Sequence, residues 1–145
     1  MRTLGQALRN AIEIERAAAR YYQRLLDHAA DADTRAFLEE MARQEEAHAG
    51  SLESIAGKLE AGEVPGSPDD RIEGVEAAPG WDSVDGLDLR QALGIAIEAE
   101  NSAALYYDAM ADHAEGRLKE FFRALSETEL DHARRLREKL AELDG

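Results

Sequence analysis

Apolar residues recur every three or four positions along most of the chain, which is the spacing of one face of an α-helix. Four segments carry this pattern and predict helices over residues 3–29, 34–60, 88–114 and 117–143. The alternation of polar and apolar residues that is typical of β-strands does not occur, so no strands are expected. The pattern therefore predicts an all-α protein.

The segment 61–87 differs from the helical segments on either side of it. It holds all three prolines and five of the eleven glycines, residues that disfavour helix interiors. Each predicted helix is about 40 Å long at a rise of about 1.5 Å per residue. The connector 61–87, if extended at about 3.3 Å of reach per residue, can cross the length of a helix.

Short turns at 30–33 and near Gly116 make the segments 3–60 and 88–143 two antiparallel hairpins. With the connector between them, they predict one domain over 1–145, a four-helix bundle with a single long crossover connection. Trp81, the only tryptophan, lies in this connector. We expect it to anchor the connector on the bundle through apolar contacts, with a binding role as the alternative.

The two hairpins repeat each other. Residues 4–29 align with 89–114 at a constant offset, which pairs Tyr22 with Tyr107, and after a one-residue deletion in the turn His48 aligns with His132. The repeat indicates a duplicated hairpin with pseudo-twofold symmetry. Polar residues on the inner faces should therefore occur in pairs.

Six polar residues interrupt the apolar stripes, all near the middle of a helix: Glu15, Glu45, His48, Glu100, Glu129 and His132. Burying four carboxylates without a counter-charge would cost many kcal/mol or force most of them to protonate. A pair of divalent cations removes that cost. The alternative, solvated glutamates on an acidic helix face, is disfavoured because other glutamates already occupy the polar faces, namely Glu13, Glu46, Glu53 and Glu98.

These six residues form two Glu-x-x-His pairs on the second and fourth helices and one glutamate on each of the others. Four carboxylates and two imidazoles in a helix bundle are the donor set of di-iron and di-manganese proteins, and hard oxygen donors favour iron or manganese over zinc. The chain has no cysteine, which excludes thiolate zinc sites, iron–sulfur clusters and cysteine nucleophiles.

Charge limits the partners that can be expected. The 31 acidic residues outnumber the 17 basic ones, for a net charge of −14, which would repel nucleic acid and anionic membrane surfaces. No apolar run is long enough for a membrane span, and the first fifteen residues hold acids where a signal peptide would be apolar. We therefore expect a cytoplasmic protein with no nucleic-acid or membrane partner.

Over both hairpins, about 110 residues, the sequence resembles the rubrerythrin and bacterioferritin branch of the ferritin-like superfamily. The resemblance rests on E-x6-Y at Glu15/Tyr22 and Glu100/Tyr107 and on E-x-x-H at Glu45/His48 and Glu129/His132. It implies a ferritin-like bundle with two iron ions per site, with manganese as an alternative.

The resemblance also implies a role for each ligand. Glu15 and His48 are expected to be the terminal ligands of one ion, and Glu100 and His132 those of the other. Glu45 and Glu129 are expected to bridge the two ions. The tyrosines Tyr22 and Tyr107 would support the site from behind the ligands. Each is either a redox-active group or a core aromatic residue whose hydroxyl satisfies a carboxylate.

Three departures from the family qualify this expectation. The rubredoxin-like domain of full-length rubrerythrins needs four cysteines, so electrons should come from an external donor protein. The extra carboxylate of typical rubrerythrins is replaced by Ile97, matched by Ile12, which makes the site more like the symmetric bacterioferritin centre. Glu46 stands where bacterioferritin has its haem-binding methionine, so no haem is expected.

The resulting prediction is an oxidoreductase that reduces hydrogen peroxide or dioxygen with electrons from ferrous iron and an external donor. The runner-up is ferritin-like iron oxidation and storage, and the third possibility is a metal that only stabilises the fold. At least a homodimer is expected, because apolar residues off the ligand stripes exceed what one core needs: Ile12, Ile14, Ile95 and Ile97. His28 and His113, also repeated, should interact with helix C-termini, with a surface metal site as the alternative.

Overall fold

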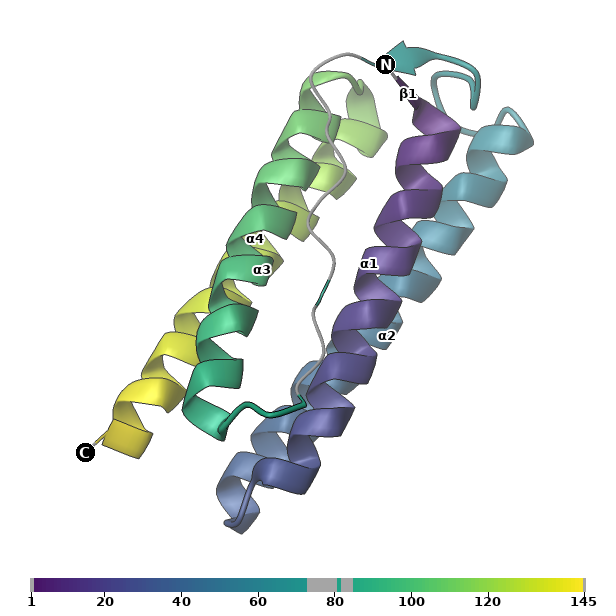
Figure 1. Ribbon diagram of the computed structural model, residues 1–145. Helices are drawn as coiled ribbons and strands as arrows, with labels where there is room; N and C mark the ends of the chain where they lie inside the picture. The colour runs from purple at the N-terminus through teal and green to yellow at the C-terminus, as the bar shows by residue number, and fades with distance from the viewer. Residues whose placement is uncertain (1, 73–80, 82–84, 145) are drawn as a thin grey trace.

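The computed structural model describes residues 2–72, 81 and 85–144, and it confirms an all-α four-helix bundle. The helices are α1 Leu4–Leu25, α2 Ala32–Glu60, α3 Leu89–Asp112 and α4 Gly116–Asp144. In Figure 1, α1 pairs with α2 and α3 with α4, as two antiparallel hairpins side by side. No helix in the described part of the chain is long and apolar enough to cross a membrane.

Side chains at the helix starts explain where the helices begin. Thr3 and Gln6 form a reciprocal capping box at the start of α1, and Asp88 and Gln91 form another at the start of α3. Asp31 caps α2 by accepting from the backbone N–H of Thr34 at 3.0 Å. These contacts satisfy backbone donors that a helix cannot pair internally.

The first helix ends earlier than the apolar pattern predicts. After Leu25 the chain tightens into a 3-10 turn, Leu26–His28 (η1), instead of continuing the α-helix to residue 29. The guanidinium of Arg35 donates to the carbonyl of Leu26 at 2.6 Å, so a freed carbonyl at this end is satisfied from α2. The apolar spacing cannot distinguish α from 3-10 geometry over three residues.

The expectation that strands are absent was wrong for two short segments. Arg2–Thr3 (β1) pairs in antiparallel fashion with Arg71–Ile72 (β2). A ladder of two residues needs no alternating run, so the sequence carries no signal for it. Beside it, the connector carbonyls of Asp70 and Pro68 accept from the first backbone N–H groups of α1 at 2.7 and 2.9 Å.

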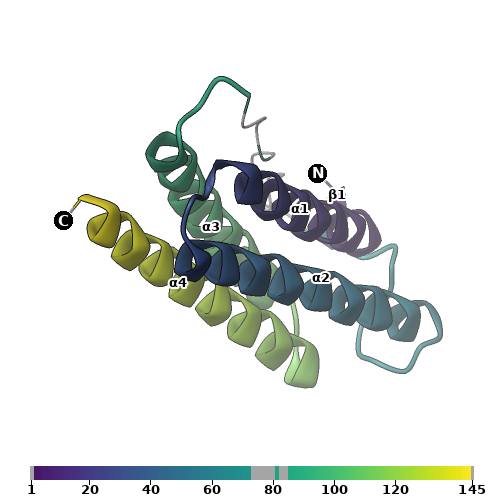
Figure 2. The same cartoon turned by 90° about the horizontal axis from the view of Figure 1, so that it is seen from below.

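The connector carries the chain from one end of the bundle to the other. The hydroxyl of Tyr21 donates to the carbonyl of Ala92, and that of Tyr106 to the carbonyl of Ala7, so α1 and α3 are antiparallel. Because α2 ends beside the start of α1 and α3 begins at the opposite end, the connection is the expected long crossover (Figures 1 and 2). Most of its middle, 73–80 and 82–84, lies outside the described residues.

Trp81 packs on the bundle, as predicted. Its ring lies against those of Tyr21 and Tyr22, with centroids 4.9 and 5.4 Å apart. These aromatic contacts hold the connector at Trp81 against α1.

The buried apolar side chains form two clusters, one toward each end of the bundle. One includes Leu8 on α1 and Leu52 on α2, and the other includes Leu25 and Leu38 on the same helices. The middle layer between them holds buried polar groups instead. The buried polar residues therefore lie within the core of the bundle.

Candidate metal centre

The fold brings the six predicted ligand residues together in the middle layer. Four glutamates, one from each helix, are at most 1% exposed, although each is a charged residue type: Glu15, Glu45, Glu100 and Glu129. His132 is also fully buried, whereas the side chain of His48 is 17% exposed. The glutamates that sequence analysis assigned to polar faces are exposed: Glu13, Glu46, Glu53 and Glu98. The distinction between inward and outward glutamates is thus confirmed.

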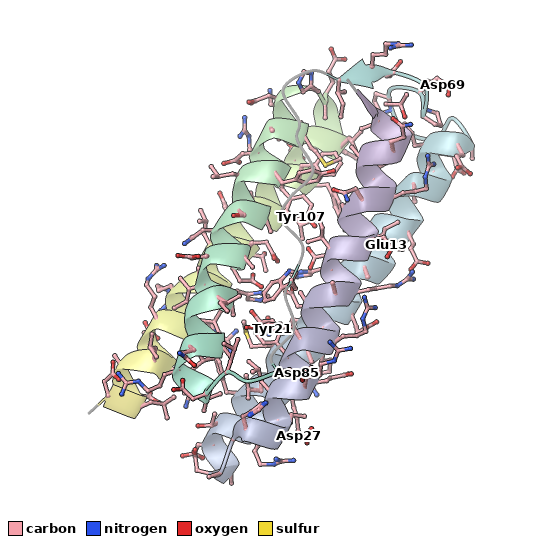
Figure 3. The ribbon with its side chains drawn as sticks, in the orientation of Figure 1. Glu13, Tyr21, Asp27, Asp69, Asp85 and Tyr107 are labelled. Atoms are coloured by element: carbon pink, nitrogen blue, oxygen red, sulfur yellow. The ribbon has the colours of Figure 1, made fainter. Side chains whose placement is uncertain are left out.

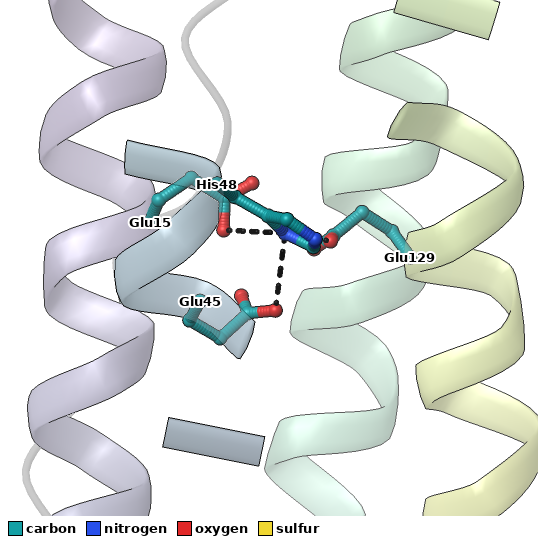
Figure 4. Close-up of side chains that lie close together, drawn as sticks. All are labelled: Glu15, Glu45, His48 and Glu129. Carbon is teal, nitrogen blue, oxygen red and sulfur yellow. Dashed lines mark ion pairs between the residues drawn. The ribbon is translucent and has the colours of Figure 1, made fainter. Parts of the chain in front are cut away.

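The ring of His48 faces three of these carboxylates (Figure 4). Its Nδ1 lies 3.1 Å from an oxygen of Glu129, 3.5 Å from one of Glu45 and 3.7 Å from one of Glu15. These four side chains come from three helices, α1, α2 and α4. They surround a single point with one nitrogen and three carboxylates.

The ring of His132 faces a matching set. Its Nδ1 lies 2.9 Å from an oxygen of Glu45, 3.3 Å from one of Glu100 and 3.8 Å from one of Glu129. The two imidazole rings are nearly parallel, with centroids 5.6 Å apart. The repeat of the hairpin therefore produces a repeat of the site.

The two sets overlap in Glu45 and Glu129. One group of potential ligand atoms comprises Glu15, Glu45, His48 and Glu129, and the other Glu45, Glu100, Glu129 and His132; within each, all atoms lie within 4.8 Å of one another. Two shared carboxylates, each between two histidine-containing positions, are the arrangement that bridging glutamates require.

Unpaired ligand atoms indicate that the site fits a metal pair. Buried atoms without a hydrogen-bond partner include Nδ1 of both histidines and at least one carboxylate oxygen of each of the four glutamates. Leaving such atoms unpaired in a protein core costs free energy for each group. Coordination to two divalent cations would satisfy these donors at once, and the oxygen-rich set suits iron or manganese.

Two tyrosines bind the carboxylates from the opposite hairpin. The hydroxyl of Tyr22 donates to Glu100 at 2.9 Å, and the hydroxyl of Tyr107 donates to Glu15 at 2.7 Å. Each tyrosine thus supports the glutamate of the other repeat and not its own. Figure 3 shows Tyr107 between the two hairpins, where both hydroxyls tie the hairpins together through the site.

Crowding of the carboxylates perturbs their ionisation. Burial, followed by repulsion from Glu100 and the other glutamates, raises the pKa of Glu45 and Glu129 well above the ordinary value. Burial also acts to raise the pKa of Glu15, but its interactions with nearby side chains, His48 foremost, outweigh burial and hold that pKa below the ordinary value. The same burial, with the nearby carboxylates, raises the pKa of Tyr22 well above its ordinary range. These shifts mark a site that does not favour four free negative charges.

Two residues beside the site were missed by the sequence analysis. The side chain of Gln44 lies 2.6 Å from Nε2 of His132, and its amide nitrogen donates to Glu40 at 2.9 Å. The repeat gave no hint of this contact, because Gln44 aligns with Thr128 in the second hairpin. The available signal was position: Gln44 lies one turn before His48, on the face of α2 that carries the ligands.

The other repeated histidines lie away from this centre. His28 is the last residue of the 3-10 turn and His113 is the C-cap of α3, so both stand at helix ends as expected. Neither belongs to the groups of described residues that could hold a metal ion. Their interaction with the helix dipole stays a prediction.

Fold and site together define a class of protein. A four-helix bundle with one long crossover, carrying two Glu-x-x-His pairs and two further inward glutamates, has the architecture of ferritin-like carboxylate proteins with two metal ions. The sequence model of the rubrerythrin family matches residues 6–90 and 91–145. The chain therefore belongs to the rubrerythrin family.

A solved structure supports the fold. The crystal structure of a Thermotoga maritima protein, described as a candidate ferritin-like diiron-carboxylate protein, matches with a TM-score of 0.83. The match covers 97% of this chain and 95% of that one at 22% sequence identity, so it establishes the ferritin-like fold alone. None of the curated proteins matches the chain.

Proposed function

We propose that the protein is a di-iron oxidoreductase of the rubrerythrin type, which reduces hydrogen peroxide or dioxygen with electrons from an external donor protein. The observation that carries this proposal is the pair of overlapping ligand groups that share Glu45 and Glu129, with unpaired donor atoms facing one another. Membership in the rubrerythrin family supports it.

In this proposal, the six residues divide as the two groups do. Glu45 and Glu129, which belong to both groups, would be shared by the two ions, and the others would be terminal ligands, with Glu15 and His48 holding one ion and Glu100 and His132 the other. Iron is the proposed metal, with manganese as the alternative, since both accept this donor set. With two ferrous ions bound, the site would supply the two electrons needed to convert one hydrogen peroxide and two protons to two waters.

The rest of the chain prepares the site for this chemistry. Apolar clusters above and below the ligand layer limit access of water, and Tyr22 and Tyr107 hold the terminal glutamates in place. The partly exposed edge of His48 marks the side from which a small oxidant can approach, because the corresponding edge of His132 is buried.

Turnover with peroxide is the decisive experiment. Protein loaded anaerobically with Fe²⁺ and supplied with a reductant should reduce peroxide for many cycles, while its iron content stays at about two ions per chain. Metal analysis before and after turnover, with rapid mixing against peroxide and separately against oxygen, identifies the preferred oxidant. Iron that binds in pairs but reacts with neither oxidant would contradict the proposal.

The excess of acidic over basic residues favours a second candidate, iron oxidation and storage. A net charge of −14 attracts Fe²⁺ toward the protein. In this case iron would accumulate into the tens per chain with successive oxidation cycles, and an assembled cage would be found. Iron content after repeated cycles therefore separates a store from an enzyme.

A further inference from the structure

The hydrogen bonds around Gln44 have only one possible direction. Glu40 is a carboxylate and can only accept, and its oxygen lies 2.9 Å from the amide nitrogen of Gln44. The amide oxygen of Gln44 must then face Nε2 of His132, 2.6 Å away, and that oxygen can only accept. The other carboxylate oxygen of Glu40 is paired with Arg43. The proton therefore lies on Nε2 of His132.

This direction determines what His132 presents to the site. With Nε2 protonated and donating to Gln44, a neutral ring keeps the lone pair of Nδ1 free. Nδ1 is the atom that faces Glu45 and Glu100, and it has no hydrogen-bond partner. The ring is thus fixed in the tautomer and the orientation that a metal ion needs.

The second hairpin does not repeat this support. Thr128, which corresponds to Gln44, turns its hydroxyl back to the carbonyl of Ala124 on its own helix at 3.0 Å. Among the described residues, none makes a hydrogen bond with Nε2 of His48, and that side chain is 17% exposed against 1% for His132. The pseudo-twofold symmetry of the ligands is therefore broken in the residues behind them.

We infer that Glu40 and Gln44 are positioning residues for His132 and that they make the two metal positions unequal. The ion beside His132 binds first and is retained, whereas the ion beside His48 binds second and exchanges with solvent. A ring held in its binding orientation loses less freedom on coordination than one that is free to turn. This inference rests on the proposed metal centre, and it adds an order of loading to it.

A zinc titration tests the order without any turnover. Zn²⁺ is added stepwise to metal-free full-length protein labelled with ¹⁵N at histidine, and the ring nitrogens are followed by NMR together with calorimetric binding. The first equivalent should shift the Nδ1 signal of His132 and leave His48 unchanged, and the second should shift His48. The metal-free spectrum should already show His132 protonated on Nε2.

Two matched variants separate the positioning role from general packing. Gln44→Leu removes the acceptor and should weaken the first binding step by about 10- to 100-fold, the usual effect of losing a hydrogen bond to a ligating histidine. Thr128→Val makes the corresponding change in the other hairpin and should leave both steps unaltered. Glu40→Gln leaves Gln44 in place but no longer dictates its direction, so it should weaken the same step by a smaller factor.

The outcomes are distinct. Equal affinities at the two positions, zinc entering beside His48 first, or equal effects of Gln44→Leu and Thr128→Val would overturn the inference while leaving the metal centre intact. No zinc binding by the wild-type protein would overturn the metal centre and this inference with it. If Gln44→Leu fails to fold, Glu40→Gln decides: an unchanged first step overturns the positioning role.

Discussion

A glutamate in the middle of a helix bundle is stable only if its charge is neutralised, paired or coordinated. Here four such glutamates lie together, and the described residues around them supply only two histidines and two tyrosine hydroxyls as partners. These partners leave several ligand atoms unpaired. The arrangement of the individual residues therefore suits metal binding better than an apolar core.

The bridging assignment predicts unequal effects for two similar substitutions. Glu45→Ala removes a ligand from both ions and should abolish paired occupancy and peroxide reduction. Glu15→Ala removes a ligand from the ion beside His48 only, so about one ion per chain should remain. Metal content after gel filtration measures the difference, and equal losses in the two variants would contradict the assignment.

The tyrosine hydroxyls predict a symmetric loss of stability. Tyr22→Phe leaves a buried oxygen of Glu100 without its donor, which should lower the free energy of unfolding of the metal-free protein by about 1–3 kcal/mol. Tyr107→Phe makes the equivalent change at Glu15 and should cost a similar amount. Urea unfolding measures both. A change below about 0.5 kcal/mol in either variant would indicate that water replaces the lost donor.

At the scale of elements, duplication of one hairpin produces most of the architecture. The same apolar spacing, the same Glu-x-x-His pair and the same two adjacent tyrosines occur in both halves. Tyr21 and Tyr106 even donate to corresponding carbonyls, those of Ala92 and Ala7. The starts of α1 and α3 are duplicated as well, because Thr3 and Asp88 occupy corresponding positions and each forms a capping box with the glutamine three residues later.

The start of α3 offers a test at this scale. Asp88 accepts from the backbone N–H of Gln91 at 2.8 Å, and the side chain of Gln91 accepts from the N–H of Asp88 at 3.1 Å. Asp88→Ala removes this cap and should lower the free energy of unfolding by about 1 kcal/mol. Glu98→Ala, an exposed change in the middle of the same helix, serves as control and should stay within about 0.5 kcal/mol.

For the whole molecule, protons should have opposite effects on the stability of the metal-free and the metal-loaded protein. Removing metal restores repulsion among the inward glutamates, so the melting temperature should fall. The raised pKa values of Glu45 and Glu129 mean that the folded metal-free protein takes up protons before the unfolded chain does. Its stability should therefore increase as the pH falls from about 7 to about 5.

The pKa of Glu15 does not reverse the expected rise in stability between about pH 7 and about pH 5. Its pKa is below the ordinary value, so its contribution to stability is lost only at lower pH. The metal-loaded protein should instead lose stability as the pH falls, because protons compete with metal for the ligands. Thermal melts of both forms across pH measure the two slopes. A metal-free protein that loses stability steadily from about pH 7 to about pH 5 would show that these carboxylates are solvated.

The predicted homodimer also belongs to this scale. The isoleucines that motivated it are covered within the chain: Ile12 and Ile14 are buried, and Ile95 and Ile97 pack on an apolar cluster. Among the described residues, the exposed large apolar side chains are Leu105 and Leu130. We still predict at least a dimer in sedimentation velocity at micromolar concentration; a single species of 16.0 kDa would contradict it.

The sequence by itself determined the helical architecture and the inward glutamates. A helix repeats with a period set by its own backbone, so the apolar spacing identifies which positions face the core without knowledge of any partner. A charged residue at such a position, such as Glu15 or Glu100, is visible for the same reason. Duplication then made the pattern too regular for chance.

Only the tertiary structure decided how side chains from different helices meet. Tyr22 binds the glutamate of the other repeat and not that of its own, and Gln44 binds the histidine on α4 and not the one on its own helix. Both choices depend on contacts between residues far apart in the chain. The two-residue ladder of β1 and β2 also depends on where the connector passes. Local periodicity carries no information on such contacts, because they are set by how the two hairpins pack.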